Sequence, residues 1–327
     1  MEKNVLLKVR NVKQWFPVNT WFFEKKKYVK AVNDVSFDLY EGETLGIAGE
    51  SGCGKSTLIR SCLRLLKPTG GTVEFEGVEI AKAKQRKLRS IRKDMQIIFQ
   101  DPYASLDPRW TVQKLLEEPL IVNKLCKSKT ERLEKVNSLL DAVSISREYA
   151  GRYPHEFSGG QRQRIAIASA LATDPKLVMC DEPVSALDVS VRAQVLNLLK
   201  ELQEERKLTY IFVSHDMSVI EYICDRVAIM YLGKIVEIGT KEDIFNNPQH
   251  PYTKALLSAV PKADEAPGSR ERIILEGDIP SPVDPPSGCV FRTRCKYATE
   301  RCAKECPATT DLGNGHQVSC HLLEEGE

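Results

Sequence analysis

Short apolar runs alternate with amphipathic stretches of helical length from Leu6 to about Asp243. This alternation is typical of α/β layers built around a largely parallel sheet. Near the start, Val35, Phe37 and Leu39 occupy alternate positions, and a second alternating run covers residues 72–76. Such runs are typical of antiparallel strands with one buried face. The pattern therefore predicts an α/β core with an antiparallel β subdomain.

The segment from Asp101 to Phe157 departs from this alternation, because it is rich in helix-forming residues and contains no convincing strand. We interpret it as a helical subdomain, at about residues 101–160, inserted into the core. From Asn246 onward Pro and Gly multiply, which marks a boundary followed by little regular structure. We therefore expect a core domain over residues 1–245 and a C-terminal extension over residues 246–327.

Composition narrows the possible partners and compartments. The 327 residues are 42% hydrophobic and 28% charged, and their net charge of +2 provides no strong field toward nucleic acid or anionic lipid. Apolar runs such as residues 177–180 fall far short of the about 20 residues that cross a bilayer. The N-terminus lacks the features of a secretory signal, so the sequence predicts a cytoplasmic protein.

A P-loop pattern lies between an apolar run at Thr44–Ala48 and an expected helix from Thr57 to Leu66. Its glycines let backbone N–H groups surround phosphate oxygens, and the helix N-terminus adds a positive dipole. Lys55 would contact the β- and γ-phosphates, and the Ser56 hydroxyl would bind Mg²⁺. The alternative, a glycine-rich turn with a surface lysine, fits the flanking elements less well. The predicted ATP-binding residues are Gly49, Glu50, Ser51, Gly52, Cys53, Gly54, Lys55, Ser56 and Thr57.

Two adjacent carboxylates, Asp181 and Glu182, end another apolar run. Neighbouring strand residues point to opposite faces, so the two side chains should have different roles. We expect Asp181 to hold Mg²⁺, usually through water, and Glu182 to polarise the water that attacks the γ-phosphate. Alone, the pair could simply begin a loop, but a preceding P-loop favours the functional interpretation.

A second candidate anion site begins at Ser158, a plausible helix N-cap followed by two glycines and a helix expected over 161–172. A helix start without a ligand is the alternative. The sequence of residues 157–161 resembles the signature of the ABC ATPases, the nucleotide-binding subunits of ATP-binding cassette transporters. The resemblance implies that this site closes over ATP held by the P-loop of another subunit, and hence a dimer. Its predicted trans contacts are Ser158, Gly159, Gly160 and Gln161.

Further motifs of the same family appear in order. Gln100 is similar to the Q-loop glutamine, which implies contact with Mg²⁺ and the attacking water and a link to the helical subdomain. Residues 185–188, ending at Asp188, resemble the D-loop that crosses the dimer interface. His215 resembles the switch histidine that contacts the γ-phosphate; a lone histidine after a strand is more often structural, so this role depends on the complete set. Tyr28 lies near the place of the family's adenine-stacking aromatic residue.

Three segments resemble a narrower group within this family, namely residues 100–109, His250–Thr253 and the stretch from Gly288 onward. They are similar to the second of the two paralogous ATPases of bacterial dipeptide and oligopeptide importers. This implies a peripheral ATPase that powers peptide import from the cytoplasmic face of the membrane. The implied partners are a second, paralogous ATPase in a heterodimer, two transmembrane permease subunits and, indirectly, an extracellular solute-binding protein; no nucleic acid is implied.

Other functions of the same motifs remain possible at this point. The motor could serve nickel or another small solute. A soluble ABC ATPase outside transport is less favoured, since the chain has neither a second cassette nor a long coiled-coil insertion. A module that binds ATP without hydrolysing it would require a missing catalytic residue, and Glu182, Gln100 and His215 are all present.

Five of the ten cysteines gather between residues 289 and 320 without any CxxC pair, which is atypical of structural zinc. Four thiolates on an irregular scaffold suit a 4Fe-4S cluster. The resemblance aligns that cluster with Cys289, Cys295, Cys302 and Cys320. Cys306 would then be spare, although a Zn²⁺ site closed by Cys302 and Cys306 is the rival and unliganded thiols are a third option. We interpret the cluster as stabilising a segment too poor in apolar residues to fold alone.

Overall fold

The computed structural model describes residues 4–18, 26–260 and 273–323. The chain divides into two compact units. The first comprises residues 1–40, 44–82 and 214–327, and the second comprises residues 41–43 and 83–213. The expected extension belongs to the first unit, although its residues 261–272 and 324–327 lie outside the described part of the chain.

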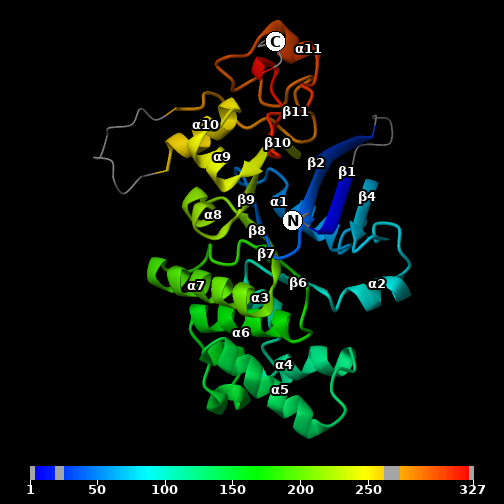
Figure 1. Ribbon diagram of the computed structural model, residues 1–327, viewed down its shortest axis with the longest axis vertical. Helices are drawn as coiled ribbons and strands as arrows, with labels where there is room; N and C mark the ends of the chain where they lie inside the picture. Colours follow the sequence, from blue (N-terminus) through cyan, green and yellow to red (C-terminus); the bar gives the residue numbers. More distant parts are fainter. Residues whose placement is uncertain (1–3, 19–25, 261–272, 324–327) are drawn as a thin grey trace. The chain divides into compact units, whose positions relative to one another are not determined.

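The first unit contains the antiparallel sheet that the alternating pattern predicts. Its apolar positions meet across neighbouring strands, because Val9 pairs with Phe37 on one side and with Val73 on the other, and all three are buried. The strands lie in the order β2-β1-β4-β5 (Figure 1). They are β1 (Val5–Val18), β2 (Lys27–Tyr40), β4 (Gly70–Phe75) and β5 (Val78–Glu79).

A second set of strands in the first unit is built around β3, whose five residues are all buried. Strand β3 pairs in parallel with β9, whereas β9–β10, β10–β12 and β11–β12 are antiparallel pairs. The bounds are β3 (Thr44–Ala48), β9 (Arg226–Tyr231), β10 (Lys234–Thr240), β11 (Thr310–Asp311) and β12 (Gln317–Val318). The C-terminal extension therefore adds a hairpin to the sheet that carries β3.

The helices of the first unit are short, and α1 follows β3 by only six residues. Helix α1 ends four residues before the predicted end at Leu66, because Arg64 adopts a left-handed conformation with φ 56°. The helices are α1 (Lys55–Cys62), α8 (Met217–Ile223), α9 (Lys241–Asn246), α10 (Pro251–Ser258) and α11 (Glu300–Lys304), with a 3₁₀ turn at His321–Leu323.

The second unit has a parallel sheet whose central strand, β7, is entirely buried between β6 and β8. The strands are β6 (Met95–Ile98), β7 (Leu177–Asp181) and β8 (Thr209–Ser214). The helices are α2 (Gln85–Ile91), α3 (Pro102–Ser105), α4 (Val112–Val122), α5 (Lys129–Ala142), α6 (Gly159–Leu171) and α7 (Val189–Arg206), with 3₁₀ turns at Arg147–Gly151 and Pro154–Glu156.

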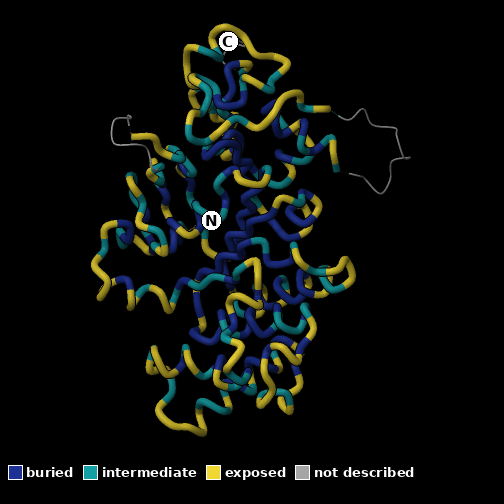
Figure 2. The backbone as a smooth tube through the Cα atoms, turned by 180° about the vertical axis from the view of Figure 1, so that it is seen from behind, coloured by how far each residue is buried: buried dark blue, intermediate teal, exposed yellow. Residues whose placement is uncertain are grey.

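No strand interrupts residues 99–176, all of which are described, as the helix-rich sequence predicts. Helices α4, α5 and α6 contact one another there, and Leu116, Leu139 and Leu140 are buried between helices of this group. In Figure 2 buried stretches of the backbone alternate with exposed ones along the chain. Among the described residues no helix is long and apolar enough to cross a membrane.

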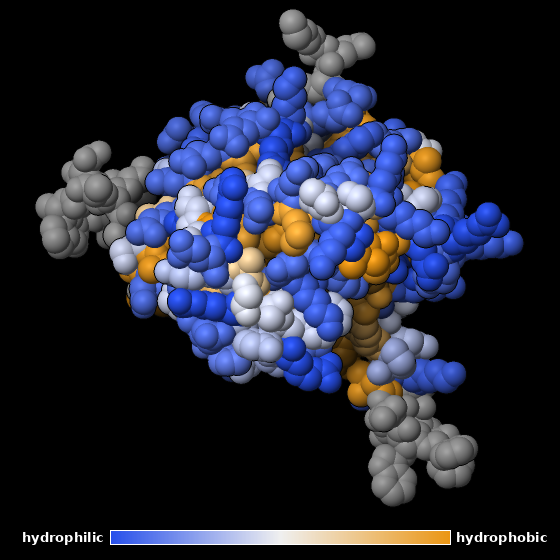
Figure 3. All heavy atoms as spheres, turned by 90° about the horizontal axis from the view of Figure 1, so that it is seen from below, coloured by the Kyte–Doolittle hydropathy of each residue, from blue (hydrophilic) through white to orange (hydrophobic). Residues whose placement is uncertain are grey.

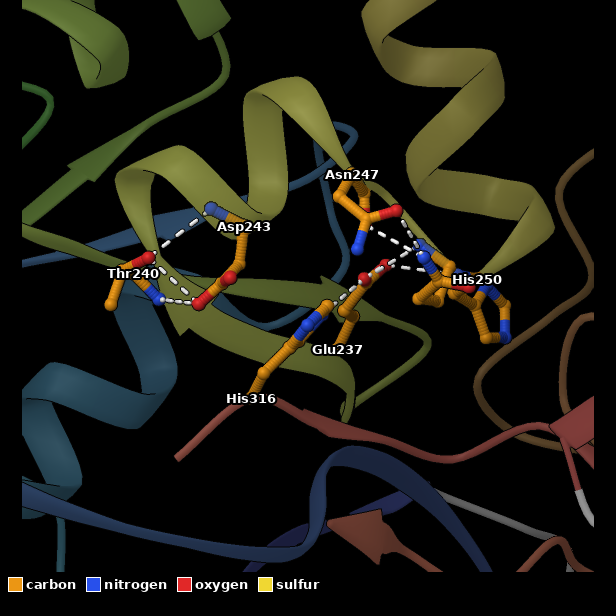
Figure 4. Close-up of polar contacts among 7 residues, drawn as sticks. Glu237, Thr240, Asp243, Asn247, His250 and His316 are labelled. Carbon is orange, nitrogen blue, oxygen red and sulfur yellow. Dashed lines mark hydrogen bonds and ion pairs between the residues drawn. The ribbon is translucent and has the colours of Figure 1, made fainter. Parts of the chain in front are cut away.

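A buried carboxylate attaches the C-terminal extension to β10. Glu237 is 0% exposed; its Oε1 accepts a hydrogen bond from the backbone N–H of Gln249 at 2.8 Å, and its Oε2 accepts one from that of His250 at 3.0 Å. His316 Nε2 lies 2.8 Å from Oε1 (Figure 4). Because burying a carboxylate is costly unless it is hydrogen-bonded, these contacts fix the start of α10 and the turn before β12 against β10.

Candidate functional site

The phosphate loop lies between β3 and α1, and close backbone approaches define its shape. Gly54 has φ 107°, and a Cβ built on it would lie 2.0 Å from the carbonyl oxygen of Ala31. A Cβ on Gly49 would lie 2.1 Å from the carbonyl oxygen of Met230. No side chain fits at either position, so β2 and the end of β9 enclose the loop and glycine is required.

Lys55 begins α1 and turns back over this loop. Its side chain is buried, and Nζ donates hydrogen bonds to the carbonyl oxygens of Gly49 at 2.8 Å and Glu50 at 2.9 Å. Phosphate oxygens bound at the helix N-terminus would compete for the same ammonium group. Burial raises the pKa of the neighbouring Cys53 thiol despite the opposing charge of Lys55. The arrangement can thus hold a polyanion, with Cys53 as a neutral packing group.

Glu50 connects the phosphate loop to the C-terminal extension. Its backbone N–H donates a hydrogen bond to the Tyr252 hydroxyl at 2.9 Å, and its Oε2 accepts one from Arg294 Nη1 at 2.8 Å. Sequence reasoning did not find Arg294 or this use of Tyr252. Partners more than 200 positions away leave no local pattern; the only signal was the resemblance over residues 250–253 and from Gly288 onward.

The second unit brings Gln100 and Glu182 together. Gln100 Nε2 donates a hydrogen bond to Glu182 Oε2 at 3.3 Å. Glu182 follows β7 with a left-handed backbone, φ 49°, and its N–H donates to the carbonyl of Val213 at 3.1 Å. Asp181 is 1% exposed, whereas Glu182 is half-buried. The two carboxylates therefore have different surroundings, as expected for strand neighbours.

The predicted signature forms a reciprocal cap at the start of α6. Ser158 Oγ accepts a hydrogen bond from the N–H of Gln161 at 3.3 Å, and Gln161 Oε1 accepts one from the N–H of Ser158 at 3.0 Å. The helix consequently begins at Gly159, two residues before the expected start. A Cβ on Gly160 would lie 2.3 Å from the Val191 side chain, so glycine permits close packing of α6 against α7. Asp188 occupies the position before α7 without a side-chain cap.

His215 and Tyr28 belong to the first unit, with the P-loop, whereas Gln100, Asp181, Glu182, the signature and Asp188 belong to the second. His215 is exposed after β8. The Tyr28 ring lies 6.3 Å from that of Trp15, and the next residues, Phe16 and Val29, pair between β1 and β2. Trp15 and Phe16 are thus additional aromatic residues in this hairpin, and the sequence prediction had named only Tyr28.

Four cysteines line one cavity in the C-terminal extension, together with apolar groups such as Phe291 and Leu322: they are Cys289, Cys295, Cys302 and Cys320. Burial raises the pKa of Cys320 to about 11. Cys306 does not line this cavity; its Sγ donates to the carbonyl of Gly288 at 3.0 Å and accepts from Lys234 Nζ at 3.6 Å. Within the described residues, no group of three or more His, Cys, Asp or Glu is placed to hold a metal ion.

Comparison with known proteins identifies the class. Residues 32–185 match the family model described as ABC transporter, and residues 236–302 match the model described as oligopeptide/dipeptide transporter, C-terminal region. A post-hydrolysis dimer of the ATP-binding cassette MJ0796 bound to ADP and Pi has a TM-score of 0.64 and 31% identity, covering 72% of this chain and 99% of that one. The fold is thus that of a P-loop ABC ATPase.

Relatives that match nearly the whole chain are more similar in sequence than this solved structure. The oligopeptide transport ATP-binding protein AppF of Bacillus subtilis is 52% identical over 98% of this chain and 98% of its own length. The dipeptide transport ATP-binding protein DppF of Haemophilus influenzae is 51% identical over 99% of this chain and 98% of its own length. The chain belongs to the family of ATP-binding proteins of ABC transporters.

Proposed function

We propose that this chain hydrolyses ATP to power the import of oligopeptides or dipeptides through a membrane ABC transporter. The observation that carries the ATPase function is the phosphate loop, where Lys55 lies across two loop carbonyls and glycines make room for the neighbouring backbone. The choice of peptides is supported by the relatives named for oligopeptide and dipeptide transport and by the match over residues 236–302.

In the proposed mechanism the P-loop amides and Lys55 bind the β- and γ-phosphates of ATP. Ser56, Asp181 and Gln100 would hold Mg²⁺ through their oxygen atoms, and the ion would neutralise charge on these phosphates. Glu182 polarises the attacking water, and its hydrogen bond to Gln100 at 3.3 Å orients the carboxylate.

Each chain contributes one P-loop and one signature, so we propose that two ATPase subunits enclose each nucleotide. Ser158, Gly159, Gly160 and Gln161 would contact the γ-phosphate held by the partner, and the exposed His215 would contact the γ-phosphate of its own chain. Asp188 would lie at the subunit interface. The capped, glycine-containing first turn of α6 supports this assignment, since the N-terminus of a helix attracts anions. Adenine would stack on the hairpin of Trp15, Phe16 and Tyr28.

Replacement of Glu182 tests the catalytic assignment. We expect Glu182→Gln to lower the steady-state ATPase rate by at least about a hundredfold, because general-base catalysis contributes about 10²–10⁴, while ATP still binds. Glu205→Gln, an exposed position on α7, is the matched control and should keep the parental rate. A Glu182→Gln rate close to that of the control would contradict the mechanism.

A groove of about 310 Å³ in the second unit is a candidate contact for a permease subunit. It is lined by residues of β6, α4 and α6 and lies next to the segment that follows Gln100. Ile121 and Val122 of α4 expose more than half of their surface. Figure 3 shows apolar patches within a largely hydrophilic face. We propose that an apolar segment of the permease binds here and attaches the chain to the cytoplasmic face of the membrane.

The permease contact can be measured by co-purification. Val122→Asp would introduce a charge at the groove and should reduce recovery of the chain with its two permease subunits, while leaving ATP binding intact. Glu131→Lys, an exposed position on α5 outside the groove, should not. Equal recovery of the two variants would argue against this docking site.

We further propose that the C-terminal cysteines hold a 4Fe-4S cluster. The donor set fits, because four thiols and no carboxylate line one mainly apolar cavity, and Cys306 lies outside it. His250 and His321 also line the cavity, but His250 Nδ1 accepts a hydrogen bond from the Tyr252 N–H and His321 Nε2 lies 3.1 Å from the carbonyl oxygen of Glu305. The free space within the cavity is about 20 Å³, close to that of one water molecule, so thiol side chains must turn outward to admit a cluster. Bound there, the cluster would crosslink segments that are far apart in this loop-rich extension.

Elemental analysis after anaerobic purification distinguishes the metals. We expect about four irons and four sulfides per chain, as the formula of the cluster requires. They should be lost in Cys289→Ser and retained in Cys306→Ser. One zinc per chain without sulfide, or no metal at all, would overturn the cluster assignment.

A further inference from the structure

The cysteine-bearing extension contacts the phosphate loop directly. Arg294 precedes Cys295, which lines the four-cysteine cavity, and donates a hydrogen bond from Nη1 to Glu50 Oε2 at 2.8 Å. The Arg294 side chain is 9% exposed and that of Glu50 is 23% exposed. Removing one partner of an ion pair that is shielded to this degree is costly, because the charge of the other partner stays largely out of water.

A second connection runs from the same turn to the backbone of Glu50. The N–H of Arg294 donates to the carbonyl of Phe291 at 3.0 Å, and the Phe291 ring lies 5.3 Å from the ring of Tyr252. Tyr252 is fully buried, and its hydroxyl accepts the hydrogen bond from the Glu50 N–H. The turn between Cys289 and Cys295 therefore holds both the side chain and the main chain of Glu50.

Glu50 in turn holds the ammonium group of the phosphate loop, because its carbonyl accepts a hydrogen bond from Lys55 Nζ at 2.9 Å. The loop has little freedom to compensate for a displaced Glu50, since Met230 and Ala31 carbonyls already lie against its two glycines. A displacement of the turn between Cys289 and Cys295 would therefore be passed to Lys55 through a single residue, Glu50.

We propose that Arg294 is a positioning residue for ATP binding and that it couples the state of the four-cysteine cavity to the phosphate loop. This inference rests on the proposed ATPase function. When the cysteines fix the turn, Arg294 holds Glu50 and Lys55 in the arrangement that binds phosphate. When the turn loosens, this arrangement is lost and ATP binds more weakly.

The first test compares two arginines of the C-terminal extension in the full-length chain. Arg294→Met should raise the ATP dissociation constant and the KM about tenfold, equivalent to about 1.4 kcal/mol, with kcat changed less than twofold. Arg294→Lys keeps the charge and should recover part of the affinity. Arg301→Met is the control: Arg301 is an exposed residue of α11 that pairs with Glu305 at 3.3 Å and does not line the cavity.

Equal ATP dissociation constants for Arg294→Met and Arg301→Met would overturn the positioning role. Thermal unfolding of both variants excludes a general loss of structure as the cause, since a purely structural role would lower the unfolding temperature without separating KM from kcat. If the unaltered chain binds no ATP, the proposed function itself fails, which is a different result.

The second test asks whether the coupling passes through Arg294. Cys302→Ser alters the cavity from α11, outside residues 289–295, and should also raise the ATP dissociation constant, whereas Cys306→Ser should not. The carbonyl of Cys302 accepts a hydrogen bond from the N–H of Cys289 at 2.8 Å, a main-chain contact that the substitution keeps. In Arg294→Met, adding Cys302→Ser should cause no further change, because the connection is already broken. The coupling would be contradicted if the two substitutions raised the ATP dissociation constant independently in the double variant. It would also be contradicted if Cys302→Ser alone left the affinity for ATP unchanged.

Discussion

Single glycines determine whether the phosphate loop can close. Gly54 adopts φ 107°, and its missing Cβ leaves room for the carbonyl oxygen of Ala31. We predict that Gly54→Ala abolishes measurable ATP binding and lowers the free energy of unfolding by more than about 2 kcal/mol, because steric overlap adds to backbone strain. Fluorescent-nucleotide titration and denaturant unfolding measure the two effects.

Gly52 provides the matched control within the same loop. It also has a left-handed backbone, φ 78°, but a Cβ there would meet no atom within 4 Å. Gly52→Ala should therefore lower the free energy of unfolding by only about 1 kcal/mol, the cost of a left-handed backbone at a residue that carries a Cβ. If the two variants were equally destabilised, the close approach of Ala31 would not explain the need for Gly54.

Burial of a thiol in α1 makes stability depend on alkaline pH. Burial raises the pKa of Cys62 from 9.0 to about 12. Between these two pH values the thiol loses its proton in the unfolded chain but keeps it in the folded chain. The contribution of Cys62 to the free energy of unfolding is therefore fully present below pH 9 and is lost as the pH rises. The slope is about 1.4 kcal/mol per pH unit. Urea unfolding from pH 8 to 10 should show a shallower decline for Cys62→Ala.

An exposed thiol serves as the comparison for that pH profile. Cys306→Ala removes a thiol at the surface and controls for the loss of one cysteine. Parallel profiles for parent, Cys62→Ala and Cys306→Ala would show that Cys62 does not titrate differently in the folded and unfolded chain.

Among single residues, the sequence shows the pattern of the P-loop but gives no sign of the contacts that hold Glu50 in place. Lys55 and the glycines follow from a local pattern, because their spacing itself shapes the loop. Arg294 was not found, since it lies 244 positions from Glu50 and only folding brings the two together. The shared cavity of the four cysteines followed from a family resemblance and not from spacing, which alone left zinc possible.

At the scale of elements, one serine serves both a helix and a candidate phosphate contact. Ser158 Oγ caps α6 through the N–H of Gln161. We predict that Ser158→Ala costs about 1 kcal/mol of stability and reduces ATP hydrolysis, since the cap and the hydroxyl are both lost. Ser158→Asp should retain the cap and the unfolding temperature, yet reduce hydrolysis further because its charge repels the γ-phosphate.

Steady-state ATPase assays paired with thermal unfolding separate these two roles. If hydrolysis followed stability, Ser158→Asp would match the parent in both measurements. That outcome would limit Ser158 to helix capping and remove it from the nucleotide site.

Element types were predictable from periodicity, whereas their ends depended on individual contacts. Strands β3 and β7 occur where the apolar runs at Thr44–Ala48 and before Glu182 indicate them. Helix α1 ends early because Arg64 turns left-handed, and α6 starts early because Ser158 and Gln161 cap each other. Neither the positive φ of Arg64 nor the reciprocal cap has a periodic signal.

For the molecule as a whole, one P-loop and one signature in each chain predict that ATP hydrolysis requires two subunits. We propose that the second subunit is a paralogue, so the chain alone should remain near 36.8 kDa in light scattering with ATP, even as Glu182→Gln. Adding the paralogous ATPase of the same transporter should produce an ATP-dependent dimer, because ATP that is not hydrolysed keeps each signature on the opposite phosphate loop.

Lys55→Ala in both subunits supplies the control, since its loss of phosphate binding should prevent dimerisation even when Glu182 is also replaced. The net charge of +2 gives no strong long-range repulsion between copies, so a failure of the chain to pair with itself would reflect its interface and not its charge. An ATP-dependent homodimer would contradict the paralogue proposal. It would still support the role of the signature in trans, because in such a homodimer ATP would connect the phosphate loop of one chain to the signature of an identical chain.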